Sequence, residues 1–324
     1  MRIRARRRDE GQILVIFALS LIVLLAMVGL VLDGGSTFAQ RRQEQNAVDL
    51  AAIAAANDLI ANQGSATWDA TARSVAAKNG YLAGTGGASL TVTCINCPGQ
   101  ALDANTPGVQ VTVNVTAPHP NGFSAIVGMS TWNVSATATA LTGWPDTATG
   151  PAPIIVSNVN FDTNGHPIHC TGPKDICNLS HPVSDTPTAI NEFTWTNFGY
   201  NKKCSDPGNV NDRGLQDYIN GYAQFSIQLL KGCYIAQHNN GVMNNIVAWA
   251  AANAPMTFPV PVVDANGNFV GWASFVMTSA TTGGRNGFIT GYFVSDFQNQ
   301  SLTVTSPGFG TSTFGGSYEL KLTN

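Results

Sequence analysis

The densest cluster of side chains that could do chemistry lies between residues 166 and 181. It combines three histidines with two cysteines: His166, His169, Cys170, Cys177 and His181. Zinc binds imidazole nitrogen and thiolate sulfur, so these residue types could form a zinc site. Disulfides beside surface histidines are the favoured interpretation, because Cys204 and Cys233 are available as partners. We therefore expect neither a metal nor a cofactor here.

The cysteines of the whole chain indicate an oxidising compartment. All six follow the N-terminal apolar segment, at Cys94, Cys97, Cys170, Cys177, Cys204 and Cys233. An even count in such a compartment favours disulfides. Pairing within domains predicts Cys94–Cys97 and two bridges among the other four, whose connectivity stays open. Cys94 and Cys97 follow a strand-like run rather than opening a helix, so we interpret the pair as a structural clip and not as a redox centre.

No catalytic motif is present in the sequence. We find no Gly-x-Ser-x-Gly elbow, no His-Glu-x-x-His and no phosphate-binding Gly-x-x-x-x-Gly-Lys. The stretch from Asp264 to Asn268 partly matches a calcium loop but lacks the downstream glutamate, and Asn266-Gly267 is better explained as a hairpin turn. We assign no catalytic residue and predict that the protein is not an enzyme.

The rest of the chain depends on an apolar run from Ile13 to Leu32. Its roughly 20 residues contain no charge and would span about 30 Å as a helix, the thickness of the bilayer hydrocarbon. Five arginines precede it: Arg2, Arg4, Arg6, Arg7 and Arg8. By the positive-inside rule that end is cytoplasmic. The sequence thus predicts a single-pass protein of the plasma (inner) membrane with its remaining domains extracytoplasmic.

Two other interpretations of the apolar run were weighed. A cleaved signal peptide has an apolar region of about 7–15 residues, shorter than this run, and the candidate site at Thr37-Phe38-Ala39 lies well past its end. A buried helix of a soluble protein would not be apolar on every face beside an arginine cluster. A permanent anchor is the favoured interpretation, and later cleavage stays open.

Composition limits the partners. The net charge is −3, and the arginine-rich first ten residues leave the remainder more acidic than the whole. A basic face is expected of a nucleic-acid-binding protein, so we predict no nucleic-acid partner. Charged residues make up 11% of the chain, where about 25% is usual. The lipid bilayer is the first partner that the sequence predicts.

Residues 33–143 are expected to form a stalk and head domain. A helix is predicted from Gln40 to Ala61, with a stripe of Val48, Ala52, Ala55 and Leu59 on one face. Whether Asp33-Gly34-Gly35 is a hinge or part of this helix stays open. A second helix is predicted at Ala66–Leu82, a helical turn at Phe123–Gly128, and strands at Ser89–Cys94, Val109–Val115 and Trp132–Leu141. This is a pilin-like plan, a long helix on a small antiparallel sheet.

The C-terminal part is expected to be a separate, predominantly β domain. We predict a cytoplasmic tail at 1–12, a transmembrane helix at 13–32, a linker at 144–153 and an extracytoplasmic β-rich domain at 154–324, an α+β protein overall. Strands are expected at Ile154–Ser157, Glu192–Thr196, Met256–Val263, Phe269–Thr278, Phe288–Ser295, Ser301–Thr305 and Ser317–Leu322. Two or three helices should pack on them, among them Asp212–Leu230 and Val242–Asn253.

The first 143 residues resemble the TadE/TadG-like family of tight-adherence (Flp) pilus assembly proteins. The resemblance rests on Gly11 with the apolar run, on Asp33, and on a motif that includes Gln45, Asn46 and Asp49. Short stretches of the second domain, such as Asn197-Phe198-Gly199 and Val270-Gly271-Trp272, are similar to extensions of TadG-like proteins. The fifth residue after Gly11 is Ile16 and not the glutamate of a processed prepilin, so we expect no processing.

The resemblance implies a membrane-anchored, non-enzymatic component of a pilus or surface-appendage assembly system that acts by anchoring and subunit packing. Its partners would be other pilus or secretion subunits, and copies of the chain itself in a homo-oligomer. The alternative is a membrane-tethered extracytoplasmic enzyme or ligand-binding module. The partner, the oligomeric state and any ligand of the second domain stay open.

Overall fold

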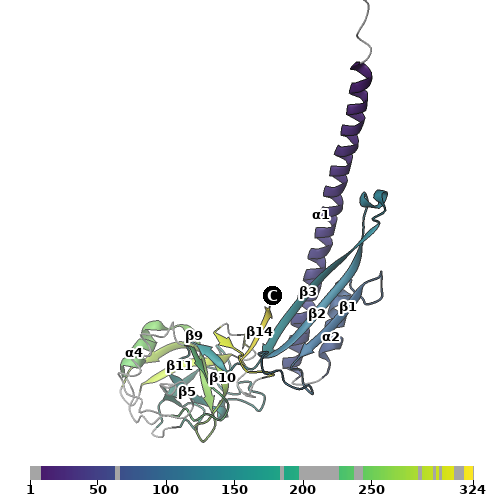
Figure 1. The fold of residues 1–324 in the computed structure, drawn as a ribbon. Coiled ribbons are helices and arrows are strands. Elements are labelled where there is room, and N and C mark those ends of the chain that lie inside the picture. Colours follow the sequence, from purple (N-terminus) through teal and green to yellow (C-terminus); the bar gives the residue numbers. More distant parts are fainter. Residues whose placement is uncertain are drawn as a thin grey trace, which may run out of the picture.

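The computed structural model describes residues 9–62, 66–182, 186–196, 226–236, 244–283, 287–294, 297–298, 301–309 and 317–323. It shows a long N-terminal helix beside a β-sheet, followed by a second, mainly β region (Figure 1). The expected α+β class is confirmed, with a long apolar helix and a predominantly β C-terminal part.

Helix α1 (Asp9–Ala61) is a single uninterrupted helix of 53 residues, about 80 Å long. The Asp33-Gly34-Gly35 step is therefore part of the helix and not a hinge. Ser36 and Thr37 stabilise the backbone here, because their hydroxyls donate to the Asp33 carbonyl at 2.9 and 2.8 Å. The apolar run and the alanine-rich run are thus continuous.

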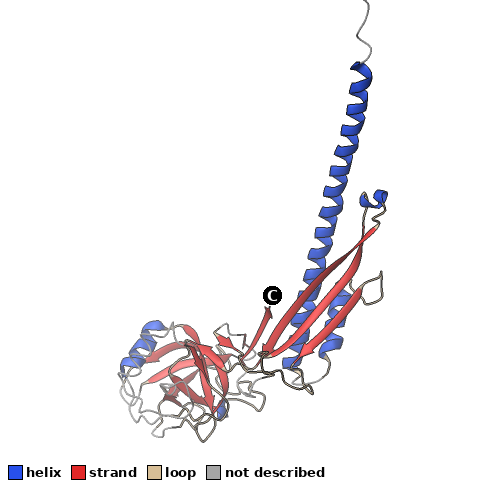
Figure 2. Ribbon diagram, viewed as in Figure 1, coloured by secondary structure: helices blue, strands red, loops and turns tan. Residues whose placement is uncertain are grey.

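The first sheet covers one side of the C-terminal half of α1 (Figure 2). It contains the expected antiparallel strands β1 (Ser89–Ile95), β2 (Val109–Pro120) and β3 (Thr131–Gly143). The short 3-10 helix η1 (Ser124–Val127) connects β2 to β3, and helix α2 (Trp68–Lys78) packs against α1. The predicted elements of this part are confirmed, with β2 and α1 longer than expected.

Small side chains join α1 to this sheet. The fully buried face of α1 includes Ala51, Ala52 and Ala55, and the sheet meets it with Val113 of β2 and Ala138 of β3. These two sheet residues are paired directly across the strands. Because alanine adds only a methyl group, the helix backbone approaches the sheet closely, and a larger side chain would have no space.

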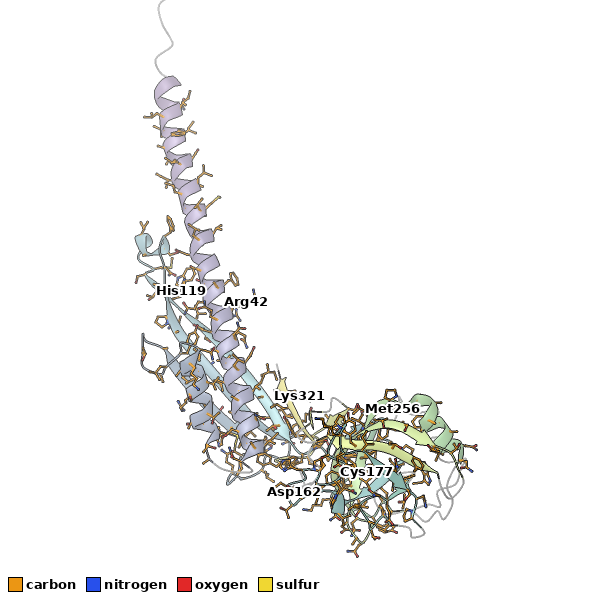
Figure 3. All side chains as sticks on the ribbon, turned by 180° about the vertical axis from the view of Figure 1, so that it is seen from behind. Arg42, His119, Asp162, Cys177, Met256 and Lys321 are labelled. Carbon is orange, nitrogen blue, oxygen red and sulfur yellow. A yellow bond between two sulfur atoms is a disulfide. The ribbon has the colours of Figure 1, made fainter. Side chains whose placement is uncertain are left out.

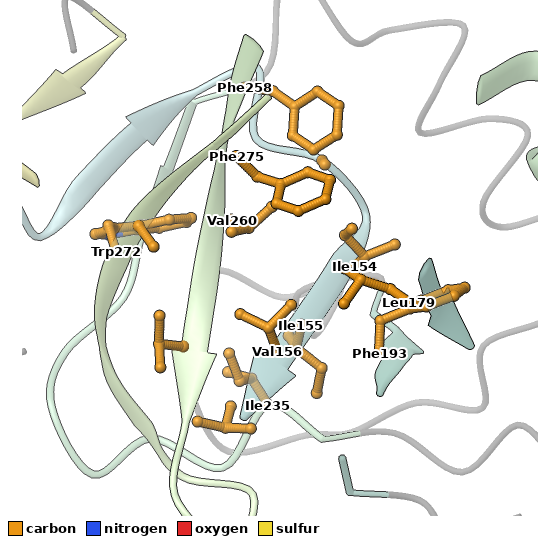
Figure 4. Packing of buried hydrophobic residues seen from close by; sticks show 14 of the residues in the cluster. Ile154, Ile155, Val156, Leu179, Phe193, Ile235, Phe258, Val260, Trp272 and Phe275 are labelled. Atoms are coloured by element: carbon orange, nitrogen blue, oxygen red, sulfur yellow. The ribbon is translucent and has the colours of Figure 1, made fainter. Parts of the chain in front are cut away.

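The second sheet has the order β6 (Cys177–Ser180), β11 (Phe288–Val294), β10 (Phe269–Thr281), β9 (Met256–Val263), β5 (Ile154–Ser157) and β7 (Phe193–Trp195). The β9–β10 hairpin turns at Asn266-Gly267 as predicted, and Asp264 accepts the backbone N–H groups of Asn266 and Asn268. Its core is aromatic: Phe275 and Trp272 of β10 are fully buried, and the ring of Phe275 lies beside that of Phe258 on β9 (Figure 4). Helix α4 (Asn244–Asn253) and the short η2 (Asn158–Asn160) complete this region.

The stretch predicted as a linker is folded between the two sheets. Strand β4 (Thr147–Thr149) pairs with β8 (Ser226–Gln228) and with β13 (Leu302–Thr303). The buried Asp146 carboxylate accepts the backbone N–H groups of Thr305 and Ser306 at 3.0 and 2.8 Å, and both hydroxyls as well. These hydrogen bonds join residues more than 150 positions apart, so the stretch at 144–153 is fixed to the rest of the fold and is not a flexible linker.

Two expectations for the second domain are wrong: the predicted strand at Ser317–Leu322 is present but does not belong to the second sheet, and the helix predicted at Asp212–Leu230 does not reach Leu230. Strand β14 (Ser317–Thr323) pairs with β3 in the first sheet, and β12 (Phe297–Gln298) pairs with β14. The C-terminus therefore returns to the N-terminal sheet, a long-range pairing that strand periodicity cannot reveal. The prediction of a helix at Asp212–Leu230 is wrong at its C-terminal end, because Ser226–Gln228 form strand β8. Residues 212–225 lie outside the described part of the chain. Strands β4, β6, β8 and β12 were not predicted.

The cysteine predictions are confirmed where the structure describes them. Cys94 is bonded to Cys97 and Cys170 to Cys177, with Cα–Cα distances of 5.9 and 5.3 Å. Cys233 is disulfide-bonded as well. Cys204, like Asn197-Phe198-Gly199, lies outside the described residues.

Replacing Ala52 by leucine should destabilise the protein by about 1–3 kcal/mol, because the added atoms have no space between α1 and the sheet. Unfolding of the full-length protein in detergent measures this. Asn57→Leu is the matched control, since Asn57 is exposed on the same helix. Equal loss of stability in both variants would contradict the tight helix–sheet packing.

Candidate functional site

The N-terminal part of α1 is apolar and almost entirely uncovered. The large side chains from Ile13 to Leu32 are 46–72% exposed, on all faces of the helix. This helix is long and apolar enough to cross a membrane. A continuous exposed apolar surface of this size is not expected in water, so it marks a surface made for lipid or for other apolar helices.

Gly29, near the outer end of the apolar run, is buried by the β2–β3 loop. A Cβ atom on Gly29 would lie 2.5 Å from the Cβ of Phe123. The loop could not lie so close to any other residue type. The first sheet therefore contacts α1 within the apolar run itself.

One helical turn further, Asp33 binds the same loop. Its carboxylate accepts the backbone N–H groups of Gly122 at 2.9 Å, Phe123 at 3.1 Å and Ser124 at 2.6 Å. These hydrogen bonds, that from Ser124 foremost, lower the pKa of Asp33 from 3.8 to about 2. Asp33 thus stays ionised and fixes the loop to the helix, although its side chain is buried.

A row of polar side chains continues along the sheet-facing side of α1. The buried ring of His119, on β2, contacts Ser36 Oγ through Nε2 at 2.9 Å and Gln40 Oε1 through Nδ1 at 2.6 Å. Gln40 Nε2 in turn donates to Glu44 Oε1 at 2.8 Å. This row fixes the end of the β2–β3 hairpin to α1 directly above the apolar run.

Glu44 is the buried end of this row. Burial raises the pKa of its carboxyl above 4.5, and the hydrogen bond from Gln40 opposes that shift. Its second oxygen, Oε2, has no hydrogen-bond partner within the described part of the chain. Burial also raises the pKa of Tyr81, and the nearby charge of Glu44 adds to it. Glu44 is therefore held in a place that favours its neutral form.

On the opposite side of α1, no element of the described part of the chain covers the helix. Phe38 is 73% exposed, and Arg41, Arg42, Asn46 and Leu50 are exposed with it. Figure 3 shows Arg42 on this side and His119 on the sheet side. A shallow depression lies among Phe38, Arg41, Arg42 and Gln45, all on one helix. We call Phe38, Arg41, Arg42, Asn46 and Leu50 the outward face of α1; it combines large apolar groups with two cations.

The predicted motif residues divide between the two sides. Asp33 binds the β2–β3 loop, and Gln45 Nε2 donates to Asp49 Oδ1 at 2.7 Å and to the Thr137 carbonyl at 3.2 Å. Asn46 is on the outward face, and Gly11 lies in the first turns of α1. Asp33 thus holds the β2–β3 loop and Gln45 binds β3, while Asp49 binds Gln45 on the same helix; the three side chains do not meet in one pocket. Residues 1–8, with the five arginines, lie outside the described residues.

Sequence reasoning missed the polar row. A signal for its helical half was present, because Asp33, Ser36, Gln40 and Glu44 follow 3-4-4 spacing in phase with the apolar stripe at Val48. No local signal identified His119, since its partners lie about 80 residues away.

A family comparison matches the segment that makes these contacts. The model of the Flp pilus-assembly TadE/G-like family matches residues 11–58. Residues 11–58 are therefore similar to this family, and we call them the TadE/G-like segment. The segment lies entirely within α1 and contains the apolar run, Asp33, the polar row of the helix and the outward face. A search of curated proteins and a search of solved structures returned no match.

The cluster considered for zinc has a different arrangement. Cys170 and Cys177 are used in their disulfide, His166 Nδ1 lies 3.3 Å from Asp162 Oδ2, and His181 Nδ1 lies 2.7 Å from the Pro182 carbonyl oxygen. Among the described residues no three ligand-type side chains gather as a metal site would require. The TadE/G-like segment is therefore the candidate functional site.

Asp33→Asn should release the β2–β3 loop, because an amide oxygen accepts more weakly and the NH₂ group would face backbone donors. Hydrogen exchange at Gly122–Ser124 should accelerate by about tenfold or more. Asp49→Asn, which removes the same charge on α1, should leave that exchange unchanged. In the wild type the folded pKa lies below the unfolded one, so this stabilisation is complete above about pH 4 and is lost as the pH falls through about 2. Unchanged protection in Asp33→Asn would show that the carboxylate does not hold the loop.

Glu44→Gln should raise the unfolding temperature at pH 7. Because the folded pKa of Glu44 is raised, its ionisation costs stability as the pH rises above the unfolded value of 4.5. The amide oxygen can still accept from Gln40. The difference between variant and wild type should shrink as the pH is lowered below 4.5. A difference that grows on acidification would contradict this assignment.

Proposed function

We propose that this protein is a membrane-anchored, non-enzymatic component of a Tad/Flp-type pilus assembly or surface-appendage system. The observation that carries the proposal is the form of the TadE/G-like segment. It leaves two surfaces uncovered: the apolar run, except where the β2–β3 loop covers Gly29, and the outward face from Phe38 to Leu50. The first suits lipid, and the second suits another protein subunit.

Anchoring is the first part of the proposed mechanism. The apolar run crosses the plasma membrane once, with the arginine-rich tail in the cytoplasm and all later residues outside. The signal-peptide alternative is less well supported, because Thr37-Phe38-Ala39 lies inside continuous helix and Thr37 is hydrogen-bonded to Asp33. The proposed division places a stalk and head at 33–143 and a second domain from 154, joined by the folded stretch at 144–153.

Subunit packing is the second part. Because the sheet and α2 occupy the other sides of α1, the outward face is where a pilin, a secretion subunit or a second copy would bind. Phe38 offers an apolar anchor, while Arg41 and Arg42 offer charges for an acidic partner. The disulfide-braced second domain would face the envelope or the appendage.

A photo-crosslinking amino acid at Phe38 should capture a pilus or secretion subunit, or another copy of this chain, in intact membranes. The same amino acid at Ser74 of α2 is the control, since Ser74 is exposed but lies on a different element. Captured proteins are identified by mass spectrometry. Recovery only of proteins unrelated to appendage assembly, or of the same proteins from both positions, would contradict the proposal.

A further inference from the structure

We infer that the loop joining β2 to β3, residues 121–130, is a second membrane contact that inserts into the outer leaflet beside α1. This inference rests on the proposed role of α1 as the anchor. It adds a surface outside the TadE/G-like segment, and it commits to lipid as the occupant.

The position of the loop is set by its contact with α1. Phe123 packs on Gly29, which lies three residues inside the outer end of the apolar run at Leu32. At about 1.5 Å per residue, this places Phe123 about 4–5 Å below the level of Leu32 along the helix axis. If the run fills the hydrocarbon of the bilayer, the loop reaches the outer hydrocarbon boundary. Figure 1 shows η1 beside α1, at the end of the sheet that faces the apolar run.

The side chains at this end are apolar and uncovered. Ile126 is 81% exposed, Met129 is 54% exposed and Phe123 is 43% exposed. No Asp, Glu, Lys or Arg occurs between Asp103 and Asp146, so no charge on these strands opposes insertion. Trp132, half-exposed at the start of β3, is of the type enriched at membrane–water interfaces.

Most backbone N–H groups of the loop are hydrogen-bonded within the protein, as a poorly hydrated environment requires. Unpaired N–H groups are costly away from water. Here Asp33 accepts those of residues 122–124, and turns within the loop accept those of Ile126, Gly128 and Met129. The Asn121 side chain donates to the Met129 carbonyl at 2.9 Å. The charge of Asp33 is itself covered by the loop, so lipid would not meet it.

Lipid is favoured over a protein partner because the loop's surface is continuous with the exposed surface of the anchor. Any bilayer that surrounds the apolar run up to Leu32 must also meet Phe123, whereas a protein partner would have to displace that lipid. The loop would then fix the tilt of the stalk relative to the membrane normal, because a second contact beside the helix restricts how the helix can lean and roll in the bilayer.

Depth-dependent fluorescence quenching tests the inference on the full-length protein in liposomes. Cysteine replaces Ile126, and the new thiol is labelled with an environment-sensitive dye. Wild type treated with the same dye gives the background signal from labelling of the native cysteines. Leu24→Cys, in the apolar run, reports whether the anchor is inserted. Leu102→Cys, exposed at the opposite end of the sheet, is the control that should remain in water. Because Ile126 and Leu102 are both exposed, neither change disturbs packing.

The expected result is quenching of the dye at position 126 by about half with a lipid-borne quencher near the head groups, and little change at position 102. Quenching at 24 with 126 behaving like 102 would overturn the inference and leave the anchor intact. Position 24, about 12 Å inside the outer end of the run, is read with a quencher deep in the acyl chains. Absence of quenching there would overturn the anchor and, with it, both the proposed function and this inference. Purified liposomes contain no partner protein, so quenching at 126 there can come only from lipid.

Discussion

Helix α1 must remain one helix while its surface changes from apolar and uncovered to packed against a sheet. In its first half every face is apolar and exposed, and in its second half one face is alanine-rich and buried against the sheet. The change occurs between Gly29 and Glu44, where polar groups enter one face in helical register. Two side chains join the helix to the hairpin there. Asp33 of α1 binds the β2–β3 loop, and His119 of β2 binds Gln40 of α1. These contacts position the first sheet, because β2 and β3 run along α1 from the point where their hairpin is bound to it.

The second domain is attached to this frame more firmly than a linker would allow. Asp146 binds residues 305 and 306, and β14 returns from the C-terminus to pair with β3. The buried Ser274 and Ser317 hydroxyls lie 3.0 Å apart and connect the two sheets directly. Motion or load applied to the second domain would therefore reach α1 through hydrogen-bonded strands. That property suits a subunit of an appendage system.

Local patterns predicted most of the elements and little of their assembly. The apolar run, the alanine stripe, the Asn266-Gly267 hairpin and the Cys94–Cys97 clip depend on residues close in sequence, and all four were predicted. The pairing of β14 with β3 and the binding of Asp33 to the β2–β3 loop depend on contacts across about 180 and 90 residues, and one sequence holds no trace of them. β8 was predicted as the end of a helix because three strand residues without their partners carry almost no periodicity.

A protease-protection experiment on intact spheroplasts tests the central claim, that one helix crosses the bilayer and carries all later residues outside. The protein would carry one epitope tag at Met1 and another after Asn324. We expect added protease to remove the C-terminal tag and to leave the N-terminal tag on a short membrane-embedded fragment that resists carbonate extraction. Protection of both tags, or release of the intact protein by carbonate, would contradict it.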